Sequence, residues 1–218
     1  MSRSFATLGF FAALGLAVSV TGNAEASVSI AVAFDALVQD ADAVALVTPV
    51  EQMSAWEDGR IFTYTRVTVD TPVAGELGAG ASAWVRTRGG VVGKIGQAVD
   101  GEPVFSMKKA SMVFLHRGAP GSYFVSARAQ GQYPVATDET TKKPKFQRAA
   151  ALGVLYPPKN AEDAPTATRG APGSQVKVQS ARPQVVATQV FAIDVIHGRP
   201  VDDVIKDVAA AYKRLHAR

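Results

Sequence analysis

Residues 61–70 read Ile-Phe-Thr-Tyr-Thr-Arg-Val-Thr-Val-Asp, the clearest strand pattern in the chain. The odd-numbered positions place Ile61, Val67 and Val69 on one face, and the even-numbered positions begin with the aromatic Phe62. Successive side chains of a strand point to opposite faces, so both faces of this strand are partly apolar. Such a strand is expected in a small closed sheet, and the stretch predicts a mainly β protein.

Turn signals and further strand patterns surround this stretch. The dipeptide Asp58-Gly59 supplies the positive φ of a tight hairpin, so we expect a turn over 56–60. The apolar run 43–50 before it predicts a buried strand, and 72–80 is a glycine-rich connection. Further short strands are expected at residues 81–87, 104–107, 112–116, 123–127 and 131–135. Many short strands separated by turn residues favour a small barrel or a sandwich.

Two segments carry a helical pattern instead. In 33–42, the apolar residues Phe34, Leu37, Val38 and Ala41 follow the i, i+3, i+4, i+7 spacing of one helix face. A second, amphipathic helix is expected to open at Pro200 near the C-terminus. Acidic residues occupy its first turn and basic residues its last, which suits the helix dipole. Its apolar stripe consists of Val201, Val204, Ile205, Val208, Tyr212 and Leu215. We expect the stripe to dock on the barrel; a partner-binding helix is the alternative.

The first 26 residues have the features of an export signal. Arg3 gives a positive start, residues 5–20 carry no charge, and Ala24-Glu25-Ala26 provides a signal-peptidase pattern, which places cleavage before Ser27. The alternative is a retained anchor, but the apolar run is shorter than the roughly 20 residues of a spanning helix. The richness in Ala, Val, Gly and Arg suggests a GC-rich bacterial genome. We therefore expect an exported protein, periplasmic or extracellular, with no membrane span after cleavage.

The remaining chain divides into three parts. Residues 27–156 form the expected β-barrel domain. Residues 157–183 contain five prolines and two glycines and too few large apolar residues to offset the cost of ordering, which predicts a disordered linker. Residues 184–218 should hold a strand and the final helix, both docking on the barrel. The apolar run 185–196 favours a strand slightly over a helix because of its β-branched content.

Composition excludes several classes of protein. The chain has 218 residues, a formal net charge of +4 and no cysteine. The absence of cysteine excludes disulfides, iron–sulfur clusters, thiolate zinc sites and cysteine nucleophiles. The mild positive charge permits weak attraction to anionic surfaces without requiring it.

No catalytic or metal-binding constellation stands out. The three histidines, His116, His197 and His216, show no ligand spacing, and no serine-nucleophile motif occurs. The adjacent carboxylates at 57–58, 138–139 and 202–203 are better explained as a turn, a loop and a helix start. The basic cluster Lys142, Lys143, Lys145 and Arg148 has one neighbouring aromatic residue, which favours a solvated loop over a nucleic-acid surface. We predict no catalytic residue, no metal, no cofactor and no nucleic-acid partner.

The most unusual stretch, the glycine-rich run 86–97, is the candidate binding loop. Its glycines and three cations could form an anion-binding nest of backbone N–H groups. It matches neither the phosphate loop nor the dinucleotide fingerprint, and a glycine-bent, bulged hairpin closing the barrel is the favoured alternative. The candidate ligand- or partner-contacting residues are Arg86, Arg88, Gly89, Gly90, Gly93, Lys94, Gly96, Gln97 and the loop-tip Trp56.

Five motifs carry a family resemblance over residues 27–135. They are Asp-Ala-Asp-Ala-Val-Ala-Leu-Val (40–47), Trp-Glu-Asp-Gly-Arg-Ile-Phe-Thr (56–63), Gly-Gly-Val-Val-Gly-Lys-Ile-Gly-Gln (89–97), Val-Phe-Leu (113–115) and Ala-Gln-Gly-Gln-Tyr-Pro-Val (129–135). In these the chain resembles a group of uncharacterised exported bacterial proteins, a likeness that brings no established activity.

The layout of a helix and short strands is also similar to the OB-like barrels of tissue metalloproteinase inhibitors and netrin modules. This likeness implies a small, closed or partly open OB-like barrel, with the short N-terminal helix, linker and C-terminal helix added to it. Those inhibitors chelate the protease zinc through an N-terminal cysteine, which this chain lacks. That inhibitory mechanism is therefore excluded, and fold likeness alone assigns no function.

These observations favour an exported, non-catalytic module that binds an exported or envelope protein, or another ligand, through barrel loops. The alternatives are a modulator or inhibitor of a secreted hydrolase, or an enzyme with an unfamiliar carboxylate or histidine site. Neither the ligand nor the oligomeric state follows from the sequence.

Overall fold

The computed structural model describes residues 28–118, 121–157 and 190–217. Five strands form a closed barrel, in the order β2, β3, β4, β8, β7 and back to β2. Their bounds are β2 Ala43–Glu57, β3 Arg60–Gly75, β4 Ser82–Arg88, β7 Ser111–Arg117 and β8 Tyr123–Val125. The β4–β8 pair is parallel and the other four pairs are antiparallel. The expectation of a mainly β protein built on a small closed barrel is confirmed.

Alternation along the strands creates the barrel interior. On β3, the odd-numbered residues from Ile61 to Val69 are buried, while the even-numbered residues between them are partly exposed. The part of the interior farther from the β2–β3 turn is aliphatic, with one aromatic ring. Its buried residues are Ala45, Val47, Val67, Val69, Ala83, Val85, Phe105, Val113, Leu115 and Val125. Nearer the β2–β3 turn, the inward positions are Thr63 and Thr65 of β3 and Thr87 of β4, with Ile61 beyond them, so this end of the interior is mostly polar.

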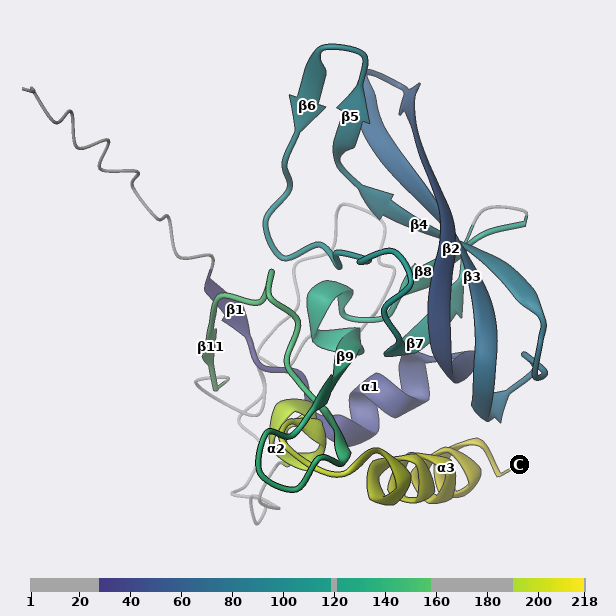
Figure 1. The fold of residues 1–218 in the computed structure, drawn as a ribbon, viewed down its shortest axis with the longest axis vertical. Helices are drawn as coiled ribbons and strands as arrows, with labels where there is room; N and C mark the ends of the chain where they lie inside the picture. Colours follow the sequence, from purple (N-terminus) through teal and green to yellow (C-terminus); the bar gives the residue numbers. More distant parts are fainter. Residues whose placement is uncertain (1–27, 119–120, 158–189, 218) are drawn as a thin grey trace, which may run out of the picture.

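Two hairpins extend beyond the ring at this polar end. The β2–β3 hairpin turns at Asp58 and Gly59, whose φ angles are 49° and 74°, as a type I′ turn requires. The second hairpin joins β5 (Gly90–Val92) to β6 (Ile95–Gln97) as a separate two-stranded sheet. The two hairpins rise together at the top of Figure 1, and the three helices lie at the bottom.

Four further strands of the described residues, all of them short, lie outside the ring. β9 (Gln132–Thr137) pairs with β7 and continues the sheet to β10 (Pro144–Phe146). The 3-10 turn η1 (Arg128–Gly131) precedes β9. β1 (Val28–Ile30) and β11 (Val154–Tyr156) form a separate parallel pair.

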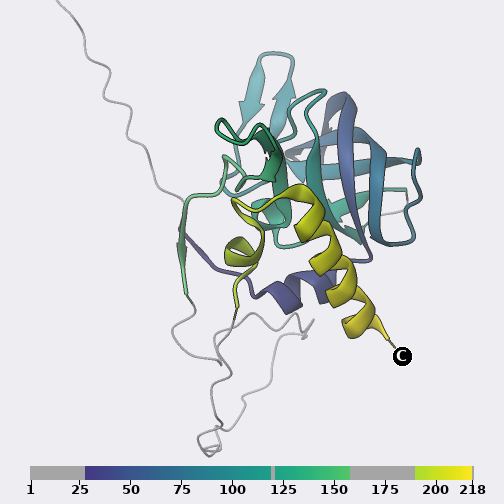
Figure 2. The ribbon, with the colours of Figure 1, turned by 60° about the horizontal axis from the view of Figure 1, so that its bottom comes forward.

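The helices form a second core on the outer faces of β2 and β7. They are α1 (Phe34–Asp40), α2 (Ala192–Ile196) and α3 (Val201–His216). Val204 and Val208 of α3 are fully buried in the same cluster as Leu37 of α1 and Phe114 of β7. Figure 2 shows α3 lying beside α1 along one side of the barrel. The expected docking of the C-terminal helix is confirmed.

Two strand predictions are wrong. Residues 104–107 form no strand, because Phe105 leaves the surface to enter the barrel interior and a turn follows at Lys108, whose φ is 62°. The strand favoured for 185–196 is wrong for Ala192–Ile196, which is helical because Ala192 and Ile196, four residues apart, are both buried against the helical core. The predicted export signal and nearly all of the predicted linker, 157–183, lie outside the described residues.

Candidate functional site

The candidate loop 86–97 leaves the end of β4 and folds into the β5–β6 hairpin. Gly89 and Gly90 make the transition with φ angles of 89° and 137°, in the region that favours glycine. Gly93 and Lys94 form the hairpin tip. The glycine-bent hairpin of the favoured alternative therefore forms, but it does not close the barrel: β8 closes the ring, and the hairpin stands beside its polar end as a separate sheet.

A cavity of about 480 Å³ lies between this hairpin, the inner face of the β2–β3 hairpin and the segment 98–105. Its wall on the barrel side consists of Gln52, Ser54, Thr63 and Thr87. The lining of the cavity is completed by Arg88, Gly89, Gly90, Val91, Gln97, Ala98, Val99, Asp100, Gly101, Glu102, Pro103, Val104, Phe105 and Ala151. The cavity is thus the mouth of the barrel, with Phe105 closing it from the aliphatic interior.

Hydroxyl and amide groups of the barrel wall are held by one another. Ser54 and Thr63 share a hydrogen bond of 2.9 Å between their hydroxyls, and Thr63 Oγ1 also donates to the carbonyl of Gly89 at 2.7 Å. Gln52 Nε2 donates to Thr65 Oγ1 at 3.1 Å. Within the described residues, none of these groups bonds to a carboxylate, imidazole or ammonium group. The wall is therefore suited to hydrogen bonding.

The hairpin is fixed to the barrel by side-chain and backbone bonds. Gln97 Oε1 accepts a 2.7 Å hydrogen bond from the N–H of the fully buried Ile61. The N–H of Gly89 donates to the carbonyl of Ile61 at 2.7 Å. A Cβ on Gly90 would lie 2.2 Å from Thr63 Oγ1, so only glycine allows this approach. These contacts preform the roof of the cavity.

The nine candidate residues fall into different places. Arg88, Gly89, Gly90 and Gln97 line the cavity. Gly93, Lys94 and Gly96 belong to the outer part of the hairpin and do not line it, whereas Trp56 lies near the tip of the β2–β3 hairpin with 47% of its surface exposed. The remaining residue, Arg86, points to the outer face of the barrel.

Arg86 braces that outer face. Its guanidinium lies 3.7 Å from the centre of the Phe62 ring and 5.6 Å from that of Phe124, and it pairs with Glu57. Arg86 Nε is buried without a hydrogen-bond partner, which its position on the Phe62 ring explains. Burial, and then the hydrogen bond to Glu57, raise the pKa of Tyr64. Arg86 is thus placed as a packing and pairing residue of the outer face.

The floor and rim of the cavity use residues absent from the sequence-based candidates. Phe105 is 5% exposed and forms the floor. The side-chain amide of Gln132, which is buried on β9, binds both backbone groups of Val104. Its Oε1 accepts from Val104 N at 3.1 Å, and its Nε2 donates to Val104 O at 2.9 Å. Glu102 accepts from the N–H of Arg88 at 3.1 Å and pairs with Arg128 at 2.8 Å. These contacts join residues far apart in sequence.

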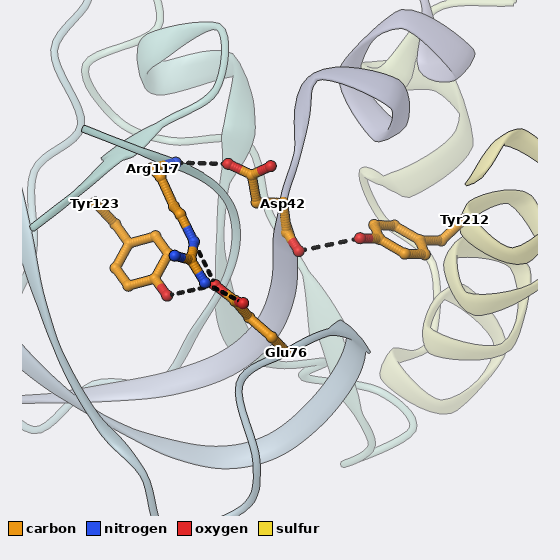
Figure 3. Close-up of polar contacts among 5 residues, drawn as sticks. All are labelled: Asp42, Glu76, Arg117, Tyr123 and Tyr212. Carbon is orange, nitrogen blue, oxygen red and sulfur yellow. Dashed lines mark hydrogen bonds and ion pairs between the residues drawn. The ribbon is translucent and has the colours of Figure 1, made fainter.

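A second polar cluster, drawn in Figure 3, lies where β2 begins and β3 and β7 end, which is the end of the barrel opposite the β2–β3 turn. Arg117 binds both carboxylate oxygens of Glu76, and the Tyr123 hydroxyl donates to the same carboxylate at 3.0 Å. The Arg117 contact, and secondarily that of Tyr123, lowers the pKa of Glu76. Asp42 accepts from Arg117 N through its side chain and from the Tyr212 hydroxyl through its carbonyl. The cluster ties β2, β3, β7, β8 and α3 together, a structural role.

The other titratable groups named in the sequence lie apart from the cavity. His116 stacks on Phe124, His197 accepts from the backbone of Arg148, and His216 stacks on Tyr212. The three adjacent carboxylate pairs occupy a turn, a loop and the first turn of α3, as expected. Lys145 of the basic cluster pairs with Asp138 at 2.7 Å, beside the buried Phe146. Among the described residues, no group of three or more His, Asp or Glu side chains could hold a metal ion.

No protein-family model, curated protein or solved structure matches this chain. The resemblance to exported bacterial proteins therefore remains a prediction, and function must be inferred from the geometry of the cavity. In the part of the chain that the structure describes, no helix combines the length and apolar character needed to cross a membrane.

Proposed function

We propose that the protein is an exported, non-catalytic binding module that holds part of a partner in the cavity at the barrel mouth. The observation that carries this proposal is the preformed polar wall of Gln52, Ser54 and Thr63 beneath the β5–β6 hairpin. Binding sites are concave and use a few fixed polar groups to set orientation, as this wall does.

The charges at the cavity favour a ligand segment with little net charge. Arg88 stands near the acidic Asp100 and Glu102 on the rim, and Glu102 is paired with Arg128. The deeper groups are hydroxyls, an amide and backbone carbonyls, none of them charged. A neutral segment carrying hydroxyl or amide groups therefore fits better than a phosphate or a strongly cationic group.

The exposed apolar residues around the cavity favour a protein as the partner. Five large apolar residues near the cavity are between 47% and 66% exposed. They are Val91 and Ile95 on the β5–β6 hairpin, Met53 and Trp56 on β2, and Val104 in the segment 98–105. A gathering of large apolar side chains at one end of a domain is typical of a protein-contacting surface. This same observation keeps a modulator of a secreted hydrolase as the second candidate function.

Affinity capture from bacterial envelope and secreted fractions, using the mature chain 27–218, tests the proposal. The variant Ala98→Trp fills the cavity from its exposed segment, and Lys94→Trp adds the same ring at the hairpin tip, outside the cavity. We expect a recurrent partner that the wild type and Lys94→Trp retain and Ala98→Trp loses.

Retention of that partner by Ala98→Trp, or no partner at all, would contradict the proposal. Loss with Lys94→Trp alone would move the contact to the hairpin tip. An inhibition assay of the captured protein, if it is a hydrolase, then decides whether the module acts as a modulator.

A further inference from the structure

Strand β2 extends well beyond one of its two neighbours. It pairs with β3 from Ala43 to Glu57, but with β7 only from Ala43 to Val47. Beyond Val47, no described strand pairs with the edge that faces away from β3. The β5–β6 hairpin does not fill this edge, because Gly90 lies over the side chains of Ser54 and Thr63 and so covers the inner face.

The register shows which backbone groups this edge offers. In a hairpin with a two-residue type I′ turn, Glu57 and Arg60 form a hydrogen-bonded pair, and every second residue of β2 then bonds to β3. The N–H and C=O groups of Gln52, Ser54 and Trp56 consequently point away from β3. Within the described residues, none of these groups makes a backbone hydrogen bond to another element.

This edge and the cavity share the same residues. Gln52 and Ser54 present their side chains to the cavity and their backbone groups to the edge. Residues that are directly opposite across two strands point their side chains to the same face. In a strand added to this edge, the residue opposite Ser54 would therefore direct its side chain to the cavity face, and its neighbours would lie beside the exposed Met53 on the outer face.

Only an extended polypeptide offers donors and acceptors at the matching interval, so the edge chemistry selects the class of occupant. The segment from Glu51 to Glu57 is about the length of an ordinary strand. A second copy of this chain is disfavoured, because antiparallel pairing centred on Ser54 would place Glu51 of each copy, which binds Arg66, opposite Glu57 of the other, which binds Arg86, so that neither carboxylate would meet a new partner of opposite charge.

We propose that the β2 edge between Glu51 and Glu57 captures an extended peptide segment of a partner protein by strand addition, with a small neutral side chain of the peptide in the cavity. Positions opposite the two glutamates are neutral or basic. This inference rests on the proposed function, for which it names the partner chemistry and the binding mode.

The test is selection of peptides from a random display library against the mature chain, followed by amide hydrogen exchange with a selected synthetic peptide. In the free protein, the amides of Gln52, Ser54 and Trp56 should exchange faster than those of Met53 and Ala55. Saturating peptide should slow the first group and leave the second unchanged. No selected binder, or protection confined to other elements, would overturn the inference.

Two variants at one position isolate the edge N–H. Ser54→Pro removes it without touching a β2–β3 backbone bond, whereas Ser54→Ala removes the hydroxyl and keeps the N–H. Because one edge hydrogen bond is lost and the proline ring obstructs the approach, we expect the proline variant to bind at least about tenfold more weakly than the alanine variant. Equal affinities would overturn the inference; if the proline variant does not fold, the exchange pattern of the wild type decides.

This test can fail independently of the proposed function. A partner that Ala98→Trp loses, combined with an unprotected β2 edge, would leave the cavity as the binding site and reject strand addition. A partner that Ala98→Trp retains would reject the cavity itself.

Discussion

Gly90 lies against the hydroxyl of Thr63 so closely that a Cβ on the glycine would stand 2.2 Å from Thr63 Oγ1. The φ of Gly90, 137°, is also one that other residues rarely adopt. We therefore expect Gly90→Ala to lower the free energy of unfolding by about 1–3 kcal/mol and to displace the hairpin from the cavity. Urea unfolding measures the first effect and amide chemical shifts of Ser54 and Thr63 report the second.

Gly96 on the same hairpin provides the matched control. Its nearest neighbour to an added Cβ would be 3.7 Å away, ordinary van der Waals contact, and its φ is not positive. Gly96→Ala should leave stability within about 0.5–1 kcal/mol of the wild type. Equal losses in the two variants would show that the close approach at Gly90 is not what constrains the hairpin.

The bond from Ile61 N–H to Gln97 Oε1 leads to a second prediction. Gln97→Leu leaves the N–H of a fully buried residue without its acceptor, which should cost about 1–3 kcal/mol of stability. Gln97→Glu keeps an oxygen at that position and should recover most of the loss near neutral pH. Urea midpoints of the three proteins test this, and a glutamate variant as unstable as the leucine variant would refute the role assigned to the acceptor.

Phe105 carries the third prediction, because it is the ring that separates the cavity from the aliphatic interior. Phe105→Ala should destabilise the protein by about 3–5 kcal/mol and open the cavity into the barrel. The adjacent Val104 is 63% exposed, so Val104→Ala should change stability by no more than about 0.5 kcal/mol. Thermal or urea unfolding of both variants compares them, and a small effect at Phe105 would show that the ring is dispensable to the core.

The sequence predicts the parts of this structure that depend on local patterns. The alternation at 61–70, the Asp58-Gly59 turn and the 3.6-residue stripe of α3 each depend on neighbouring residues, and each forms as expected. The strand predicted at 104–107 does not form, because the single inward ring of Phe105 belongs to no repeating pattern that the sequence could show. The strand predicted for Ala192–Ile196 was wrong, because burial against the other helices outweighed the strand propensity of its β-branched residues.

The candidate site was predicted only in part, for the same reason. Glycine density at 89–97 marked the hairpin roof, and Gly89, Gly90 and Gln97 do line the cavity. The floor and the brace at Phe105 and Gln132 come together through the barrel topology, which no local pattern specifies. The open edge of β2 likewise arises because the β2–β7 pairing is shorter than the β2–β3 pairing. This difference cannot be seen until both partner strands are known.

Asp138 gives the fourth prediction, on pH. Its hydrogen bond from Lys145, and next those from Thr141, hold the pKa of this carboxyl well below its usual range. A depressed folded-state pKa means that the carboxylate stabilises the fold fully above its unfolded pKa of about 3.9, and that this stabilisation is lost as the pH falls toward the folded value. Asp138→Asn, which keeps an oxygen for Thr141, should therefore be less stable than the wild type at neutral pH. The difference between their urea midpoints should shrink progressively below about pH 4. A constant difference from neutral to acid pH would show that the charge of Asp138 is not what stabilises the β9–β10 connection.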